Sequence, residues 1–185
     1  MGGARLAAAM AKYVELRRHT DADGDVLTPE GVQAAIEIGA RLEGGYEVLV
    51  STGAQRATQT LACFVAGLGE KVPRGVVVEP GLRSRAEDRW RAAYEKAGSG
   101  TLQALREADP ELVEEDSATL AAALRRVVDG LRDGGRALVV GHSPTNEAAV
   151  FGLAGEIVDP ISKGGGVLLI DEDGTFRVEQ LDWRP

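Results

Sequence analysis

Both histidines of this 185-residue chain follow runs of residues that are typical of β-strands. His19 comes after "KYVELR" and stands directly behind Arg18, whereas His142 comes after "RALVVG". Arg56 follows a third apolar run, "YEVLVS", at the start of a predicted helix. Histidine can act as a nucleophile near neutral pH, and arginine binds phosphate oxygens through two parallel hydrogen bonds. Residues of these types predict phosphoryl chemistry, provided that the fold brings them together.

The elements that must position these residues alternate between strands and helices. This alternation predicts a three-layer α/β/α sandwich with a mostly parallel central sheet and an antiparallel C-terminal edge. Thr28, Ser117 and Ser143 are the expected helix caps. We expect strands at 12–17, 46–51, 75–80 and 136–141, helices at 28–45, 55–69, 86–96, 100–108, 117–135 and 143–155, and a closing hairpin of 166–171 with 176–181.

Arg18, His19, Arg56 and His142 all fall at the ends of predicted strands or at the starts of the helices that follow. Ligands of open α/β sheets bind beyond the carboxyl ends of the strands. Helix N-termini at this edge add unpaired N–H groups and a partial positive charge. The sequence therefore predicts a site for a doubly charged tetrahedral anion, for which phosphate is the natural candidate.

Four segments in order carry a resemblance to a known family. They are "LRRHT", "LTPEGVQAA", "VSTGAQRATQTL" and "LVVGHSP", and together they span residues 13 to 155. These segments resemble the motifs of the histidine phosphatase superfamily, whose fold is called phosphoglycerate mutase-like. Because the chain is short, it is most similar to the small bacterial phosphohistidine phosphatases of that superfamily.

The resemblance implies a role for each residue of the set. His19 would be the nucleophile that takes the phosphoryl group as a phosphohistidine. Arg18, Arg56 and His142 would hold the equatorial phosphate oxygens. The resemblance implies neither a metal nor another cofactor, since phosphoryl transfer needs mainly positioning and charge stabilisation.

Thr20 departs from the family pattern, in which glycine usually follows the nucleophile. Glycine permits a close approach of the backbone to a ligand, so Thr20 could narrow the pocket. Its hydroxyl is also a candidate contact for the phosphate. The alternative is a harmless substitution in a loop.

Ser84 is a second departure, since it stands where many family members carry a glutamate that serves as the general acid. Glu87, Asp88 and Asp21 are the candidate replacements, and the alternative is that all three are solvated charges. Without an acid, a labile phosphoryl group is easier to remove than an alkyl phosphate. We therefore expect phosphohistidine or another labile phosphate as the substrate.

Two other functions stay open at this point. The first is a phosphoglycerate mutase-type phosphotransferase, although the chain is short where extra closing segments would lie. The second is a non-catalytic phosphate-binding module. The arginines near Ser84 could steer an anionic substrate or could pair with neighbouring acids; they are Arg83, Arg85, Arg89 and Arg91.

Composition limits the partners. The net charge of −8 argues against binding to nucleic acid or to an anionic membrane, so we expect a phosphorylated small molecule or a phosphoprotein. The lone Cys63 fits a reducing compartment, and the apolar stretch 6–10 is shorter than a signal peptide requires. We expect a single cytoplasmic domain over 1–185, with an N-terminal extension over 1–11. The oligomeric state is left open.

Overall fold

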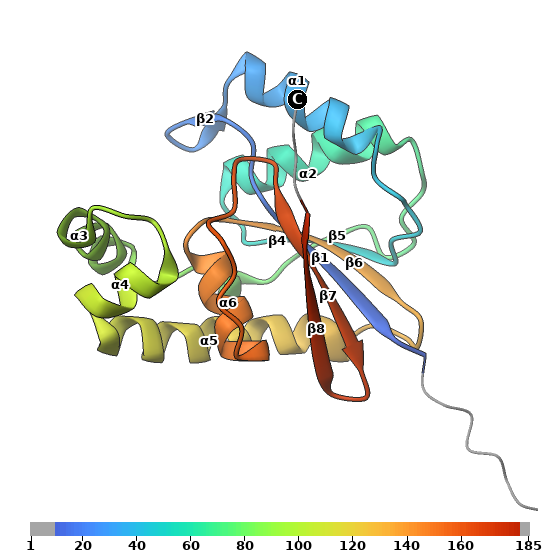
Figure 1. Cartoon of the computed structure of the whole chain (residues 1–185). Coiled ribbons are helices and arrows are strands. Elements are labelled where there is room, and N and C mark those ends of the chain that lie inside the picture. The colour runs from blue at the N-terminus through green and yellow to red at the C-terminus, as the bar shows by residue number, and fades with distance from the viewer. Residues whose placement is uncertain (1–9, 182–185) are drawn as a thin grey trace, which may run out of the picture.

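A six-stranded sheet runs through the centre of the chain, in the order β5-β4-β6-β1-β7-β8 (Figure 1). The structure, a computed structural model, describes residues 10–181. In chain order the strands are β1 (Lys12–Arg18), β4 (Val48–Ser51), β5 (Val76–Val78), β6 (Arg136–Gly141), β7 (Gly166–Glu172) and β8 (Thr175–Leu181).

The strands from β5 to β1 in this order are parallel, and β7 is antiparallel to both β1 and β8. In the register of β1 with β6, Arg18 pairs with Gly141. In the register of β4 with β6, Ser51 pairs with Val140. The three strands therefore end together at one edge of the sheet. The predicted mostly parallel sheet with an antiparallel C-terminal edge is confirmed.

Helices cover both faces of the sheet, which completes the three predicted layers (Figure 1). Alternate side chains of β6 serve the two faces, as the twofold repeat of a strand requires. Leu138 and Val140 pack with Phe64 under α1 and α2, whereas Val139 packs with Leu120 over α5 and α6. The helices are α1 (Pro29–Gly39), α2 (Gln55–Leu68), α3 (Glu87–Ala97), α4 (Leu102–Ala108), α5 (Pro110–Asp129) and α6 (Thr145–Ala154), with a 3₁₀ turn, η1 (Pro80–Leu82).

Helix α5 begins earlier than its sequence pattern predicts. We expected a helix over 117–135 capped by Ser117, but the helix spans Pro110–Asp129. Asp109 is the N-cap, and its side chain accepts a hydrogen bond from the backbone of Leu112. The Asp-Pro pair that resembles a break is in fact a start signal, because proline suits the first helical position. Ser117 is instead buried inside the helix.

Smaller differences lie at other element boundaries. Helix α1 ends at Gly39 rather than continuing to residue 45, and the second predicted strand begins at Val48 rather than at 46. Ser143 does not cap α6, because its hydroxyl donates to Glu147 instead. A short hairpin that the sequence did not reveal joins β2 (Ala22–Asp23) to β3 (Val26–Leu27).

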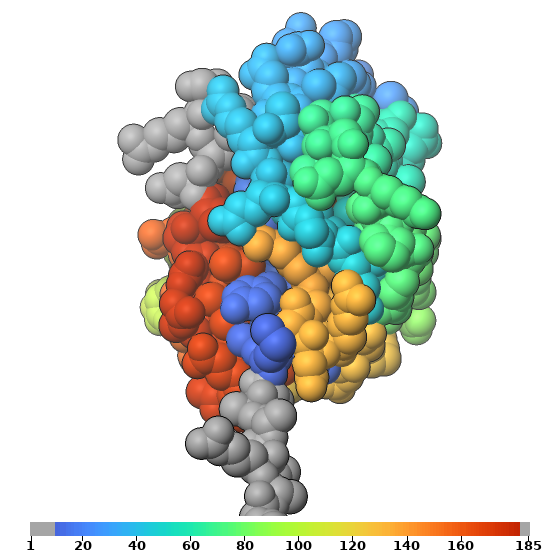
Figure 2. All heavy atoms as spheres, turned by 90° about the vertical axis from the view of Figure 1, so that its right-hand side faces the viewer, coloured from blue at the N-terminus to red at the C-terminus, as the bar shows by residue number. Residues whose placement is uncertain are grey.

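The two ends of the sheet differ in what surrounds them. Figure 2 faces the end at which β1 begins, where β1 (blue) lies between the β7–β8 hairpin (red) and the residues that lead into β6 (orange). Helices α3 and α4 lie beside the opposite end, where β1 and β6 finish (Figure 1). Most of the expected extension over 1–11 lies outside the described residues. Within residues 10–181, no helix has both the length and the apolar character that crossing a membrane would require.

Candidate active site

The register of β1 with β6 places the two histidines side by side. Each histidine is the first residue after its strand, and the backbone N–H of His19 donates to the carbonyl of Gly141 at 3.0 Å. The two imidazole centroids are 5.3 Å apart, and the ring planes are inclined by 59°. Residues separated by more than a hundred positions thus form one site at the carboxyl end of the sheet.

The hydrogen bonds of His19 fix its tautomer. Its Nδ1 lies 2.7 Å from the carbonyl oxygen of Thr20, and a carbonyl can only accept, so Nδ1 carries the proton. The other ring nitrogen, Nε2, then carries no proton, and its lone pair accepts a hydrogen bond from Nε of Arg56 at 3.3 Å. The atom with nucleophilic character therefore faces the cation that would hold a phosphate.

Both imidazoles are held neutral by their surroundings. Burial is the largest cause that lowers the pKa of His19 to about 4, and Arg56, Arg18 and Lys163 lower it further by repulsion. Burial also lowers the pKa of His142 to about 3, with Arg56 and His19 as the next causes. At neutral pH the site therefore carries arginine charges beside two uncharged rings, which suits nucleophilic attack on an anion.

Arg56 is oriented by an aspartate that the sequence did not single out. Asp25, in the β2–β3 turn, accepts from Nη1 of Arg56 at 2.8 Å. The same carboxylate accepts from the backbone N–H groups of Gln55 and Arg56. Ala54, at the N-cap position of α2, supplies no side-chain bond, so Asp25 caps this helix from a distant loop.

Arg18 is anchored by the loop between α6 and β7. Its Nη1 donates to the carbonyl of Ile161 at 3.0 Å, and its buried Nε finds no partner within the described chain. The N–H of Ile161 donates in turn to the buried carboxyl of Glu147 at 2.8 Å. Burial raises the pKa of Glu147, while the charge of Arg18 opposes that shift. Glu147 and Ile161 thus act together to position Arg18.

His142 and Thr20 are each hydrogen-bonded to a threonine side chain. Thr52 places its hydroxyl 2.9 Å from Nε2 of His142. The hydroxyl of Thr20 lies 3.4 Å from that of Thr60, and the N–H of Thr20 donates to the same oxygen at 3.3 Å. Thr20 is only 2 % exposed. Its hydroxyl is therefore engaged with α2, and a phosphate contact from Thr20 stays a prediction.

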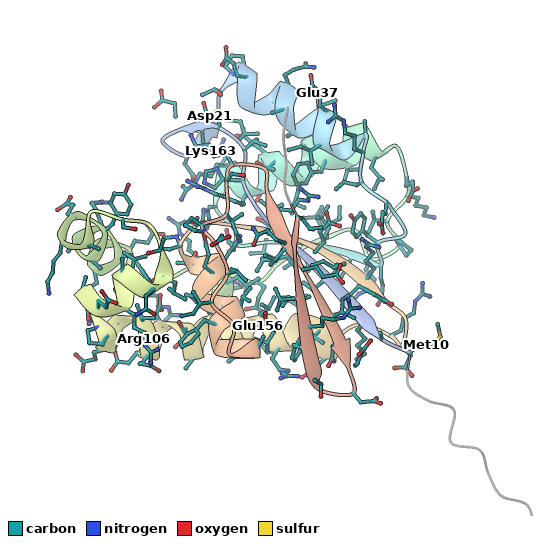
Figure 3. All side chains as sticks on the ribbon, in the orientation of Figure 1. Met10, Asp21, Glu37, Arg106, Glu156 and Lys163 are labelled. Atoms are coloured by element: carbon teal, nitrogen blue, oxygen red, sulfur yellow. The ribbon has the colours of Figure 1, made fainter. Side chains whose placement is uncertain are left out.

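The three candidate proton donors lie in different surroundings. Asp21 is paired with Lys163, and this bond is the main cause that lowers the pKa of Asp21 (Figure 3). Asp88 is almost fully exposed on α3 and pairs with Arg91. Glu87 borders the cavity beside the histidines, where it forms an ion pair with Arg83 at 2.8 Å.

A cavity of about 300 Å³ opens next to the histidines. Its volume is at the lower end of the range for small-molecule sites. Ser84, at the position where the family pattern has a glutamate, is buried in its wall, and its hydroxyl accepts from the N–H of Ala86. The lining residues come from the start of α2, from the residues that follow β6, from the segment before α3 and from α3 itself; they include Arg56, Arg83, Trp90, Tyr94 and His142.

Comparison with known proteins identifies the family. Residues 9–160 match the histidine phosphatase superfamily (branch 1). This chain belongs to the histidine phosphatase superfamily. The match includes all four residues, Arg18, His19, Arg56 and His142, that the sequence motifs singled out. No curated protein sequence matches the chain significantly.

Solved structures share the fold of this histidine phosphatase superfamily member. Phosphoglycerate mutase from Bacillus anthracis aligns with a TM-score of 0.73 at 19% identity, over 94% of each chain. The protein histidine phosphatase SixA, solved with tungstate, aligns with a TM-score of 0.58 at 23% identity, over 91% of this chain and 96% of its own. Phosphoserine phosphatase from Entamoeba histolytica aligns with a TM-score of 0.64 at 15% identity, over 94% of this chain and 98% of its own. At identities this low, the structural similarity establishes the fold alone, which is phosphoglycerate mutase-like.

Several residues of this superfamily member's site gave little signal in the sequence. Asp25 lies in an acidic stretch, "DADGD", whose composition is typical of a solvated loop. Glu147 lies four residues after Ser143, a spacing that places both on one side of a first helical turn. Thr52 directly follows a buried strand, as both histidines do. Position after a strand was therefore the one signal that could have found Thr52.

Proposed function

We propose that this chain is a metal-independent phosphatase that works through a phosphohistidine on His19. The observation that carries the proposal is the tautomer of His19. Thr20 holds the proton on Nδ1, and Nε2 presents its lone pair beside Arg56. A ring that only bound phosphate as a donor would need a proton on Nε2.

The proposed reaction has two steps. In the first, Nε2 of His19 forms a bond to phosphorus while the bond from phosphorus to the leaving group breaks in line. Arg18, Arg56 and His142 hold the three equatorial oxygens, where charge develops. In the second, a water oxygen bonds to phosphorus while the bond from phosphorus to Nε2 breaks. The electron pair of that bond returns to Nε2, the water loses a proton to solvent, and phosphate departs.

The substrate of this phosphatase is proposed to be phosphohistidine or another labile phosphate. Among the described residues that line the cavity, Glu87 is the single carboxylate, and it is engaged in an ion pair with Arg83. A carboxylate that is turned toward an arginine is not aimed at a leaving group, so the described lining of the cavity offers no evident proton donor. A substrate whose leaving group departs without a proton therefore fits this site best.

The cell context and the partner are part of the same proposal. A phosphorylated small molecule or a phosphoprotein would be the partner, and the cytoplasm the compartment. The acidic surface supports a partner other than nucleic acid, and the lone Cys63 is consistent with a reducing environment.

The test is to incubate the protein with acetyl phosphate or a phosphohistidine peptide and to measure both phosphate release and protein labelling. We expect a phosphoprotein that is labile in acid and stable in base. His19→Ala should lose both the label and the turnover, while Arg85→Gln, which lies outside the cavity lining, should keep both.

Two results would overturn the proposal. Saturable phosphate binding without turnover would indicate a binding module. Transfer of the phosphoryl group to an added hydroxy acid rather than to water would indicate a mutase-type phosphotransferase.

A further inference from the structure

The cavity beside the histidines has a preformed aromatic wall. Trp90 and Tyr94 lie one helical turn apart on α3 and both line the cavity. Trp90 is 4 % exposed, and its Nε1 donates to Asp116 at 2.6 Å, which fixes the indole. Tyr94 is 54 % exposed and lies nearer the solvent. A flat apolar group could pack against this wall with little loss of side-chain entropy in the protein.

The same cavity holds more positive charge than one phosphate requires. Arg56 serves the phosphoryl group, and Arg83 and Arg91 line the cavity as well. Glu87 offsets one of these charges through its ion pair with Arg83. Within residues 10–181, Arg91 forms one ion pair, with Asp88. These two side chains are 70% and 95% exposed, so the pair adds little stability and the guanidinium can turn toward a ligand. A local excess of positive charge in an acidic protein indicates an anionic ligand.

We infer that the cavity lined by Trp90, Tyr94, Arg83 and Arg91 binds the leaving group of an aryl phosphate that carries a second negative charge. The inference rests on the proposed phosphatase function and names its substrate class. The aromatic ring would pack against Trp90 and Tyr94. The second anion, such as a carboxylate, would lie against Arg91 and Arg83.

An aryl leaving group also agrees with the lining of the cavity, whose single carboxylate among the described residues, Glu87, is engaged with Arg83. A phenol has a pKa of about 10, far below that of an aliphatic alcohol, so a phenolate leaves far more readily than an alkoxide. When Nε2 of His19 bonds to phosphorus, the bond from phosphorus to the phenolic oxygen breaks and its electron pair stays on that oxygen. The phenolate then takes its proton from solvent.

The experiment compares 4-carboxyphenyl phosphate with 4-carbamoylphenyl phosphate. The two have the same size, and the amide withdraws electrons more strongly, so leaving-group chemistry alone would favour the amide. We expect kcat/KM to favour the carboxylate by about fivefold, as direct contact with an exposed cation allows. Arg91→Gln should lower this preference about threefold, and Arg83→Gln with Arg91→Gln should abolish it.

Arg85→Gln is the matched control, because it removes the same charge from the segment before α3 without touching the cavity lining. It should leave the preference unchanged. Tyr94→Ala should reduce kcat/KM for both aryl phosphates relative to acetyl phosphate, which has no ring.

Failure of this inference can be told apart from failure of the proposed function. An amide preference in the wild type, or equal effects of Arg91→Gln and Arg85→Gln, would overturn the inference. A phosphohistidine peptide that is hydrolysed faster than either aryl phosphate would also overturn it. All three results leave the His19-dependent label intact, whereas loss of that label overturns the proposed function itself.

Discussion

Neutral histidines beside arginines define the chemistry of this site at the scale of single residues. A protonated imidazole at His19 would lack a lone pair at Nε2 and could not attack phosphorus. Burial is the largest of the causes that prevent this protonation, and the nearby cations add to it. In the proposed mechanism the same arginines therefore serve two purposes, since they would bind the phosphoryl group and they also help to keep His19 neutral.

The lowered pKa of His19 predicts a pH-dependent stability. As the pH falls from 6.5 to 4, the unfolded chain gains a proton at this residue while the folded chain does not. The free energy of unfolding must therefore decrease as the pH decreases. Above pH 6.5 both states are neutral and the effect vanishes. We expect a loss of about 1 kcal/mol from His19 between pH 7 and pH 5, discounted for its partial exposure.

Urea unfolding of the wild type and His19→Gln at both pH values checks this expectation. Glutamine is neutral throughout, so the variant should lose less stability on acidification than the wild type. If both proteins lose the same amount, His19 has an ordinary pKa in the folded state.

The residues to which the proposed mechanism assigns the chemistry were accessible from the sequence because each lies in or beside a recognisable element. Arg18, His19 and His142 adjoin strands with clear apolar patterns. Asp25 and Glu147 were missed because their roles depend on contacts with α2 and with the α6–β7 loop, which no local pattern encodes. Long-range contacts of this kind appear only when the chain is folded.

At the scale of elements, the turn between β2 and β3 serves helix α2. Asp25 accepts from two N–H groups at the start of α2 and from the side chain of Arg56. A carboxylate at this place also offsets the positive end of the helix dipole. The turn thus stabilises the helix and aims the arginine through one side chain.

Asp25→Ala should therefore weaken both stability and substrate binding. We expect a loss of about 1 kcal/mol in the free energy of unfolding, typical of a lost helix cap. We also expect KM to rise about fivefold, because Arg56 loses the partner that orients it. Asp25→Asn keeps an acceptor oxygen, so its stability and its KM should lie between those of the wild type and Asp25→Ala. Urea unfolding and steady-state kinetics together measure both quantities. Wild-type KM in Asp25→Ala would contradict a positioning role.

Sequence patterns located the elements well but placed several of their ends poorly. Apolar runs predict β6 and β1 because both are buried on two faces. Helix α5 began seven residues earlier than expected, at Pro110 instead of 117, since Asp109-Pro110 serves equally as a break and as a start. The β2–β3 hairpin has only two residues in each strand, too few for a period-two pattern.

At the scale of the whole molecule, close helix contacts on both faces of the sheet depend on glycine. On one face, a Cβ at Gly67 of α2 would lie 2.1 Å from the carbonyl oxygen of Ile36 in α1. On the other face, a Cβ at Gly152 of α6 would lie 2.2 Å from the carbonyl oxygen of Ser117 in α5. Such contacts let backbones approach closely, so α6 can pack on α5 while its first turn follows His142.

Gly152→Ala should therefore destabilise the fold. The added methyl meets backbone atoms that cannot rotate away, so α6 must shift from α5, at a cost of about 2–3 kcal/mol in the free energy of unfolding. Gly100→Ala is the matched control, because its Cβ would find its nearest neighbour at 3.5 Å, an ordinary contact. Its effect should stay within about 0.5 kcal/mol. Urea unfolding of both variants separates the two cases, and equal midpoints would show that α5 and α6 yield without strain. A shift of α6 would also move Glu147 and, through Ile161, the guanidinium of Arg18, so Gly152→Ala should raise KM even at temperatures where it remains folded.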